Sequence, residues 1–135
     1  MNKWRIAFVK EYTPSPLSFW VHRHLDHEVW SQATEFEPNL PKAIPSKGYP
    51  VLFVNAFGTE LKFSSVEEVE HFLQVISMKH MPSSLQLTRQ RGAAYGPNRH
   101  WLSRLPSKLK PWSKREKFIP IIESGLREFK ALYTS

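Results

Sequence analysis

Residues 51–63, VLFVNAFGTELKF, limit the possible folds of this chain more than any other stretch. Two apolar runs rich in strand-forming residues lie on either side of Phe57-Gly58-Thr59. Two such runs joined by a short connection that contains glycine are typical of a β-hairpin. The sequence therefore predicts two adjacent antiparallel strands in the middle of the chain.

A helix is predicted directly after this hairpin. Ser64 or Ser65 can cap its first turn, and Glu67 or Glu68 stands three residues further on, as in a capping box. Apolar residues then recur at helical spacing, which predicts one buried face. The helix is expected to end near Lys79, before a proline. The apolar stripe consists of Val66, Val69, Phe72, Leu73 and Ile76.

Three further segments of the N-terminal half have recognisable patterns. Residues 3–9 alternate apolar and polar side chains, which predicts a half-buried strand. Residues 18–31 are interpreted as a second extended run after a proline turn. Residues 38–50 contain four prolines and are expected to form an extended surface loop, either a functional loop or a passive spacer.

The C-terminal half is predicted to be helical but interrupted. Residues 83–91 and 98–105 are interpreted as two short helices, and the prolines of residues 106–111 are expected to keep that stretch extended. A capping box then opens a long helix over residues 114–133. Pro120 is expected to kink this helix or to mark a restart, because proline removes a backbone donor.

These elements predict an α+β fold. Strands come first and helices later, which favours a small antiparallel sheet from the N-terminal half, packed by two or more helices from the C-terminal half. At 135 residues the chain is long enough for one domain, so we expect a single domain over residues 1–135. Within it, residues 1–78 form a strand-rich half with one helix, residues 79–117 a basic segment, and residues 114–133 the last helix.

Composition narrows the possible classes of protein. The chain has no cysteine, which excludes disulfides, thiolate metal ligands and thiol nucleophiles. The first apolar run is too short for a secretory signal, and no run approaches the length of a membrane span. We therefore expect a soluble, intracellular protein, most simply a cytoplasmic one.

The net charge of +7 is concentrated in one segment. Residues 1–78 balance at −2 and residues 118–135 at zero, whereas residues 79–117 carry ten Lys or Arg against one Glu, a balance of +9. Such asymmetry points to a polyanionic partner. Lysine and arginine bind phosphates with a strong salt dependence, and aromatic rings can stack on bases.

The leading functional hypothesis is thus a non-catalytic nucleic-acid-binding protein or subunit, with either DNA or RNA as partner. The alternative is a protein-interaction or regulatory module that docks on a larger, acidic partner. The helical pattern also has the outline of a helix-turn-helix. The candidate nucleic-acid-binding residues are Arg89, Arg91, Tyr95, Arg99, Trp101, Arg104, Lys108, Lys110, Trp112, Lys114 and Arg115.

One short motif suggests different chemistry. The stretch His22-x-His24-x-Asp26-His27 resembles the zinc signature of the metallo-β-lactamase superfamily. That family needs further histidine and aspartate ligands downstream, but Asp26 is the only aspartate of this chain. In an extended segment His22 and His24 would share a polar face, so they remain weak candidates for metal ligands and no metal site is predicted.

Other catalytic motifs give little support to an enzyme. Glu60-Leu61-Lys62 has the Glu-x-Lys form found in restriction-type nucleases, but no second acidic ligand is evident. A GxSxG nucleophile elbow and glycine-rich phosphate loops are absent from the sequence. The sequence therefore favours a protein without catalytic activity and implies no cofactor.

Overall fold

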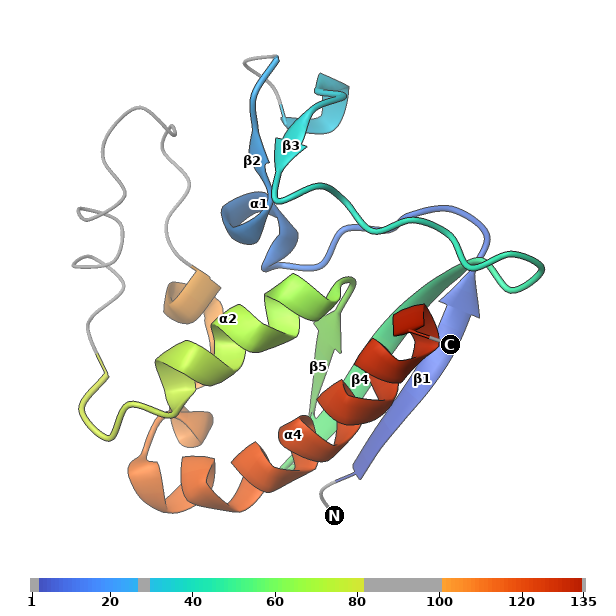
Figure 1. The fold of residues 1–135 in the computed structure, drawn as a ribbon. Helices are drawn as coiled ribbons and strands as arrows, with labels where there is room; N and C mark the ends of the chain where they lie inside the picture. Colours follow the sequence, from blue (N-terminus) through green and yellow to red (C-terminus); the bar gives the residue numbers. More distant parts are fainter. Residues whose placement is uncertain (1–2, 27–29, 82–100, 135) are drawn as a thin grey trace.

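The computed structural model describes residues 3–26, 30–81 and 101–134. A three-stranded antiparallel sheet forms one layer, and two helices cover one of its faces (Figure 1). A separate pair of two-residue strands lies at one end of this body. Strands from the N-terminal half thus pack against helices that follow them, and the α+β prediction is confirmed.

The central hairpin is formed by β4 (Tyr49–Ala56) and β5 (Thr59–Phe63). Its two connecting residues, Phe57 and Gly58, have φ angles of 49° and 82°. Positive φ at both positions is the mark of a type I′ turn, whose twist matches that of the two strands. The hairpin prediction is confirmed, although β4 begins at the end of the predicted proline loop.

The first strand completes the sheet. β1 (Lys3–Val9) pairs antiparallel with β4, so the strand order is β1-β4-β5 and both β1 and β5 are edge strands. Alternation along β1 turns Trp4 and Ile6 toward the core. Trp4 also donates a hydrogen bond from Nε1 to the Ser124 hydroxyl, 3.3 Å away. The predicted strand at residues 3–9 is confirmed.

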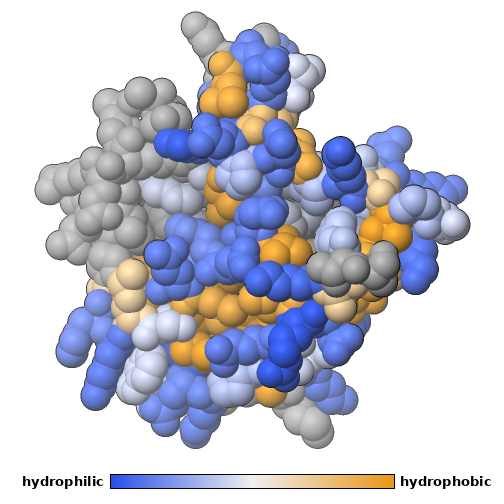
Figure 2. All heavy atoms as spheres, in the orientation of Figure 1, coloured by the Kyte–Doolittle hydropathy of each residue, from blue (hydrophilic) through white to orange (hydrophobic). Residues whose placement is uncertain are grey.

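Two helices cover the inner face of the sheet. α2 (Val66–Ile76) begins at the Ser65 cap, whose hydroxyl accepts the Glu68 amide. α4 (Trp112–Thr134) crosses β4 and β1 (Figure 1). Lys130 and Glu70 join the two helices by an ion pair of 2.9 Å. Figure 2 shows a hydrophobic band where the helices meet, between mainly hydrophilic surfaces.

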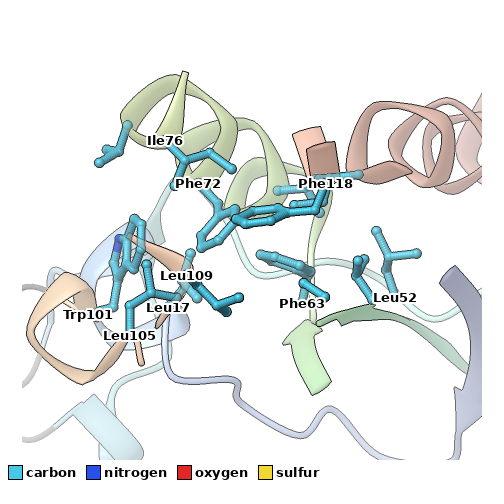
Figure 3. Close-up of a cluster of buried hydrophobic side chains, with 14 of the residues drawn as sticks. Leu17, Leu52, Phe63, Phe72, Ile76, Trp101, Leu105, Leu109 and Phe118 are labelled. Carbon is cyan, nitrogen blue, oxygen red and sulfur yellow. The ribbon is translucent and has the colours of Figure 1, made fainter. Parts of the chain in front are cut away.

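The core lies between these layers (Figure 3). Phe63 and Leu52 from the sheet meet Phe72 and Phe118 from the helices, and all four are at most 1% exposed. Phe63 and Phe72 pack edge to face at 5.1 Å between ring centroids. Figure 3 also shows a second group of side chains beside Phe72, formed by Leu17, Trp101, Leu105 and Leu109.

The extended run predicted for residues 18–31 is wrong. Its start is a helical turn, α1 (Ser18–Val21), and only Arg23–His24 form a strand, β2, which pairs with β3 (Phe36–Glu37). A 3₁₀ turn, η1, covers Trp30–Gln32. The serines explain the turn, because the Ser18 hydroxyl accepts the Ser15 amide and favours a helical start.

This change reverses the two faces of the segment. Phe19 and Leu25 are 41% and 57% exposed, whereas His22, which an extended segment would place on its polar face, is fully buried. Alternation was the wrong period, because a helical turn rotates successive side chains by about 100° rather than 180°. His22 is buried at the end of this turn and His24 is half-buried in β2, so the two histidines do not share a polar face.

The segment before α4 also differs from the prediction. Residues 106–111 are not extended: η4 (Ser107–Leu109) is a 3₁₀ turn that buries Leu109 completely. In place of a helix over residues 98–105, the described part is the short 3₁₀ helix η3 (Trp101–Arg104). Proline is compatible with the first turn of a helix as well as with an extended chain. Here the helical turn is favoured, because it buries Leu109. The predicted helix at 83–91 lies outside the described residues.

α4 continues through Pro120 without a restart. Pro120 has no amide hydrogen to donate to the Glu116 carbonyl one turn earlier. Because both residues are exposed, water can donate a hydrogen bond to that carbonyl instead. Among the described residues, no helix combines the length and the apolar character needed to cross a membrane.

Candidate functional site

The most unusual feature of the interior is a charged residue in the first turn of α2. Glu68 has no exposed surface. A buried carboxylate is costly unless it is hydrogen-bonded, and Glu68 has an extensive set of partners. Its two oxygens accept hydrogen bonds from the hydroxyls of Tyr12, Ser15, Ser18 and Ser65 and from the Ser64 amide.

His22 completes this buried polar cluster. Its Nδ1 donates to the Pro38 carbonyl at 2.8 Å, and its Nε2 lies 2.7 Å from the Ser65 hydroxyl and 3.5 Å from a Glu68 carboxylate oxygen. Pro38 follows a cis peptide bond. The cluster therefore ties the end of α1 and the proline loop to the start of α2.

The proton positions in this cluster follow from its geometry. The Pro38 carbonyl can only accept, so Nδ1 of His22 must carry a proton. When Nε2 is protonated as well, it donates to Ser65, and the Ser65 hydroxyl is free to donate to Glu68. Each polar atom of the three side chains then has a partner, so the geometry fits an imidazolium beside a carboxylate.

The pKa shifts of the pair agree with this arrangement. Burial lowers the pKa of His22, but the hydrogen bond to Glu68, the Pro38 carbonyl and the charge of Glu68 outweigh it, and the net pKa is raised. Burial raises the pKa of Glu68, but hydrogen bonds from His22, Ser15 and the Ser64 amide outweigh it, and the net pKa is lowered. Both shifts favour the ionised pair.

A serine, a histidine and a carboxylate also suggest a hydrolase, but the arrangement differs from a catalytic relay. In a relay, the carboxylate holds Nδ1 and the serine is open to substrate. Here Glu68 lies on the Nε2 side together with Ser65, which is fully buried and already caps α2. We conclude that this cluster holds three chain segments together.

The other residues of the zinc-like motif are not placed beside His22, and His27 lies outside the described residues. His24 pairs with Phe36 in the small two-stranded sheet, while both ring nitrogens of His22 are engaged in the interior. Hydrogen bonds from the Thr34 hydroxyl and from the Glu35 and Thr34 amides lower the pKa of Asp26 to about 2. Within residues 3–26, 30–81 and 101–134, no group of three potential ligands gathers around a metal position.

The predicted nucleic-acid-binding residues fall into three groups. The first group lies outside the described residues and comprises Arg89, Arg91, Tyr95 and Arg99; the Arg104 side chain is also outside them. The second group, Trp101 and Arg115, is buried at 4% and 3% exposure. The third group, which comprises Lys108, Lys110, Trp112 and Lys114, reaches the surface.

The buried pair has structural partners. Trp101 packs on Phe72 at 4.9 Å between ring centroids, so its ring faces are not open for stacking on bases. The Arg115 guanidinium donates to the carbonyls of Ile76, Met78 and Lys79, and its Nε donates to Lys110. Arg115 thereby donates hydrogen bonds to carbonyl groups that have no amide partner at the end of α2.

Two of the surface lysines, Lys108 and Lys114, meet at the tip of the β4–β5 hairpin. Lys108 Nζ donates to the Phe57 carbonyl at 3.1 Å, and Lys114 Nζ lies 4.5 Å above the Phe57 ring. Lys117 follows Lys114 by three residues on α4, which makes them surface neighbours. We call Lys108 and Lys114, together with their sequence neighbours Lys110 and Lys117, the hairpin-tip lysines.

Sequence patterns did not identify the buried cluster. Glu68 was predicted only as a capping residue, and nothing in the pattern distinguished it from an exposed one. The available signal was the serine pair Ser15 and Ser18, spaced to cap a turn, with Tyr12 nearby. The partners come from segments more than 40 residues apart in sequence, which local periodicity does not connect.

Comparison with known proteins gave no match: the chain resembles no protein-family model, no curated protein and no solved structure.

Proposed function

We propose that this protein binds nucleic acid through phosphate contacts made by the basic segment, with the hairpin-tip lysines as the part of the interface that the structure describes. The observation that carries the proposal is the position of Lys108 and Lys114 around Phe57. Two cationic side chains from different elements approach one loop, although charge repulsion alone would separate them.

The charges of this cluster are available to a ligand. Among the described residues, no ion pair engages any of the hairpin-tip lysines. Glu116 is exposed between Lys114 and Lys117 in sequence, and it is the only acidic residue of the basic segment. An excess of unpaired lysines on one surface attracts a polyanion and releases its counterions.

The burial of Trp101 limits how bases are contacted. Trp112 is half-buried, and Arg115 lies 5.1 Å from its ring centroid. Among the described candidates, stacking is thus left to Trp112, and phosphate contacts carry most of the affinity. Such contacts position a nucleic acid without reading its sequence.

A matched pair of variants tests the proposal. In the first, Lys108, Lys110, Lys114 and Lys117 become Ala. In the control, four exposed lysines elsewhere become Ala: Lys3, Lys10, Lys42 and Lys47. Both variants lose four charges, so a general effect of net charge weakens both equally.

Fluorescence anisotropy with labelled single- and double-stranded oligonucleotides at 50 mM salt is the measurement. We expect the hairpin-tip variant to lose at least tenfold more affinity than the control. Equal loss in the two variants contradicts a site at the hairpin tip, and no binding by the native chain contradicts nucleic-acid binding altogether.

Protein interaction is a second candidate function, and one observation favours it. An apolar groove runs along the edge of β5, which no strand among the described residues covers.

A further inference from the structure

The groove beside β5 has a volume of about 280 Å³. All five residues of β5 line it, although their side chains alternate between the two faces of the sheet. A cavity contacts every residue of a strand only when it lies along the backbone edge. The groove is therefore the position that a further strand of the sheet would occupy.

The other wall of the groove is apolar. It lies on the inner side of the sheet and is formed by four side chains of the core and two exposed prolines. Figure 3 shows Leu17, Trp101 and Leu105 gathered beside Phe72. The full wall comprises Pro16, Leu17, Phe72, Trp101, Leu105 and Pro106. Leu61 faces the same side and remains partly exposed.

The turn determines which backbone groups of β5 face the groove. In a two-residue hairpin the flanking residues, Ala56 and Thr59, form a hydrogen-bonded pair, and bonded and non-bonded pairs then alternate. Leu61 and Phe63 thus bond to β4. The amides and carbonyls of Glu60 and Lys62 point away from β4, toward the groove.

We propose that this groove binds an extended peptide segment of a partner protein, which adds to β5 as a fourth strand of the sheet. The backbone of the peptide pairs with Glu60 and Lys62. Its side chains on the inner side are apolar and contact Leu17, Trp101 and Leu105. This binding mode supplies affinity through main-chain hydrogen bonds and specificity through alternate side chains.

Charge defines one further position of the peptide. Glu60 already pairs with Arg5 at 3.6 Å, whereas no ion pair among the described residues engages Lys62. A residue opposite Lys62 projects from the same face of the sheet at about 5.5 Å between Cα atoms. The peptide is therefore acidic at the position opposite Lys62.

The walls favour a single strand over a second copy of the chain. A second copy would bring its own helix layer over its β5. On the inner side of the sheet, the fourth-strand position is already covered by Trp101 and Leu105, which pack against Phe72. A second helix layer would have to occupy the same place. A peptide carries no such layer.

The first experiment uses the full chain and two synthetic nine-residue peptides of the same composition. In one, valine alternates with threonine and a central glutamate; in the other, the valines are consecutive. We expect the alternating peptide to bind at least tenfold more tightly in a titration followed by NMR. Equal affinity, or no binding by either peptide, overturns the proposal.

Hydrogen exchange in the same samples locates the bound strand. We expect the Glu60 and Lys62 amides to gain protection when the alternating peptide binds, while the Leu61 amide is already protected by β4. Binding that leaves both amides unprotected overturns the proposal. If both amides are protected without peptide and the chain has the mass of a dimer, the occupant is a second copy, which also overturns it.

A pair of variants tests the backbone contact directly. Lys62→Pro removes the amide that faces the groove and leaves the hydrogen bonds of Leu61 and Phe63 to β4 in place. Lys62→Ala removes the charge and keeps the amide. We expect at least a tenfold loss of peptide affinity for Lys62→Pro and a smaller loss for Lys62→Ala. Equal losses would contradict main-chain pairing.

Discussion

Arg115 shows how a single residue can change its interpretation between sequence and structure. Its position in a basic segment suggested a phosphate contact. In the structure its donors serve four carbonyls at the end of α2 and before α4. Burial lowers its pKa, but an arginine keeps its charge at any physiological pH. Arg115 is therefore a structural connector between the two helices.

We expect Arg115→Met to lower the free energy of unfolding by about 2–4 kcal/mol, because several carbonyls lose a charged donor. Methionine keeps the length of the apolar stem, so the loss reports the hydrogen bonds. Lys114→Met is the matched control, since Lys114 is half-exposed at the next position. Urea unfolding compares the two. An Arg115→Met variant as stable as Lys114→Met would show that the carbonyls do not need these donors.

The His22–Glu68 pair makes stability depend on pH in two directions. The pKa of Glu68 is lowered from 4.5, so its contribution is present above pH 4.5 and is lost as pH falls through the folded value. The pKa of His22 is raised from 6.5, so its contribution is complete below pH 6.5 and is lost as pH rises through the folded value. The pair stabilises most between pH 4.5 and 6.5.

His22→Asn tests this dependence, because asparagine can still donate to the Pro38 carbonyl but has no group in place of Nε2. We expect the variant to be less stable by about 3 kcal/mol near pH 6, since Glu68 is left buried without its cationic partner. The difference from the native chain should shrink above pH 6.5 and below pH 4.5. Thermal unfolding across pH 4–9 measures it, and a difference that does not change with pH would contradict an ionised pair.

At the scale of elements, two positions of the chain require glycine for different physical reasons. Gly58 has a φ of +82° and open space where a Cβ would lie, whereas Gly48 has a φ of +99° and a Cβ there would lie 2.5 Å from the Val9 carbonyl oxygen. Glycine is thus required at position 58 only because of the positive φ angle. Gly48 also allows the close approach of the chain to the end of β1.

We expect Gly58→Ala to cost about 1–2 kcal/mol of unfolding free energy, the usual penalty for a left-handed non-glycine residue. Gly48→Ala should cost more, because the methyl group meets backbone that cannot move without disturbing β1. Chemical denaturation of the two variants gives the comparison. Equal costs would mean that the contact between Gly48 and Val9 is readily relaxed.

The sequence predicted those elements whose signals are local. The hairpin around Phe57-Gly58 and the serine cap of the following helix each depend on two to four neighbouring residues, and both predictions are confirmed, the first as a type I′ turn and the second with Ser65 as the cap. The prediction for residues 18–31 failed because an alternating pattern competed with a helical turn that hydrogen bonds of Ser15 and Ser18 stabilise. The helical turn is favoured because it buries His22 beside Glu68. The hydrogen bonds of both residues join segments that are far apart in the sequence.

The candidate interface was predictable only in part. Net charge located the basic segment, but charge does not distinguish Arg115, which is buried, from Lys114, which reaches the surface. The same holds for Trp101 and Trp112 among the aromatic residues. The groove beside β5 had no sequence signal, because its wall combines residues from both halves of the chain.

At the scale of the whole molecule, the distribution of charge is the basis of the proposed function. The whole surplus lies in residues 79–117, and two of its lysines, Lys108 and Lys114, approach each other where η4, α4 and the hairpin tip meet. A polyanion that binds there should neutralise several lysines at once and release their counterions.

The most direct test of this claim is the salt dependence of oligonucleotide binding by the native chain. If the four hairpin-tip lysines neutralise four phosphates of duplex DNA, the affinity should fall by at least about 150-fold between 50 and 200 mM salt, from a slope near −0.9 per phosphate. The variant without these lysines should lose most of that slope. A native affinity that is absent at 50 mM salt, or that does not change with salt, would contradict the account.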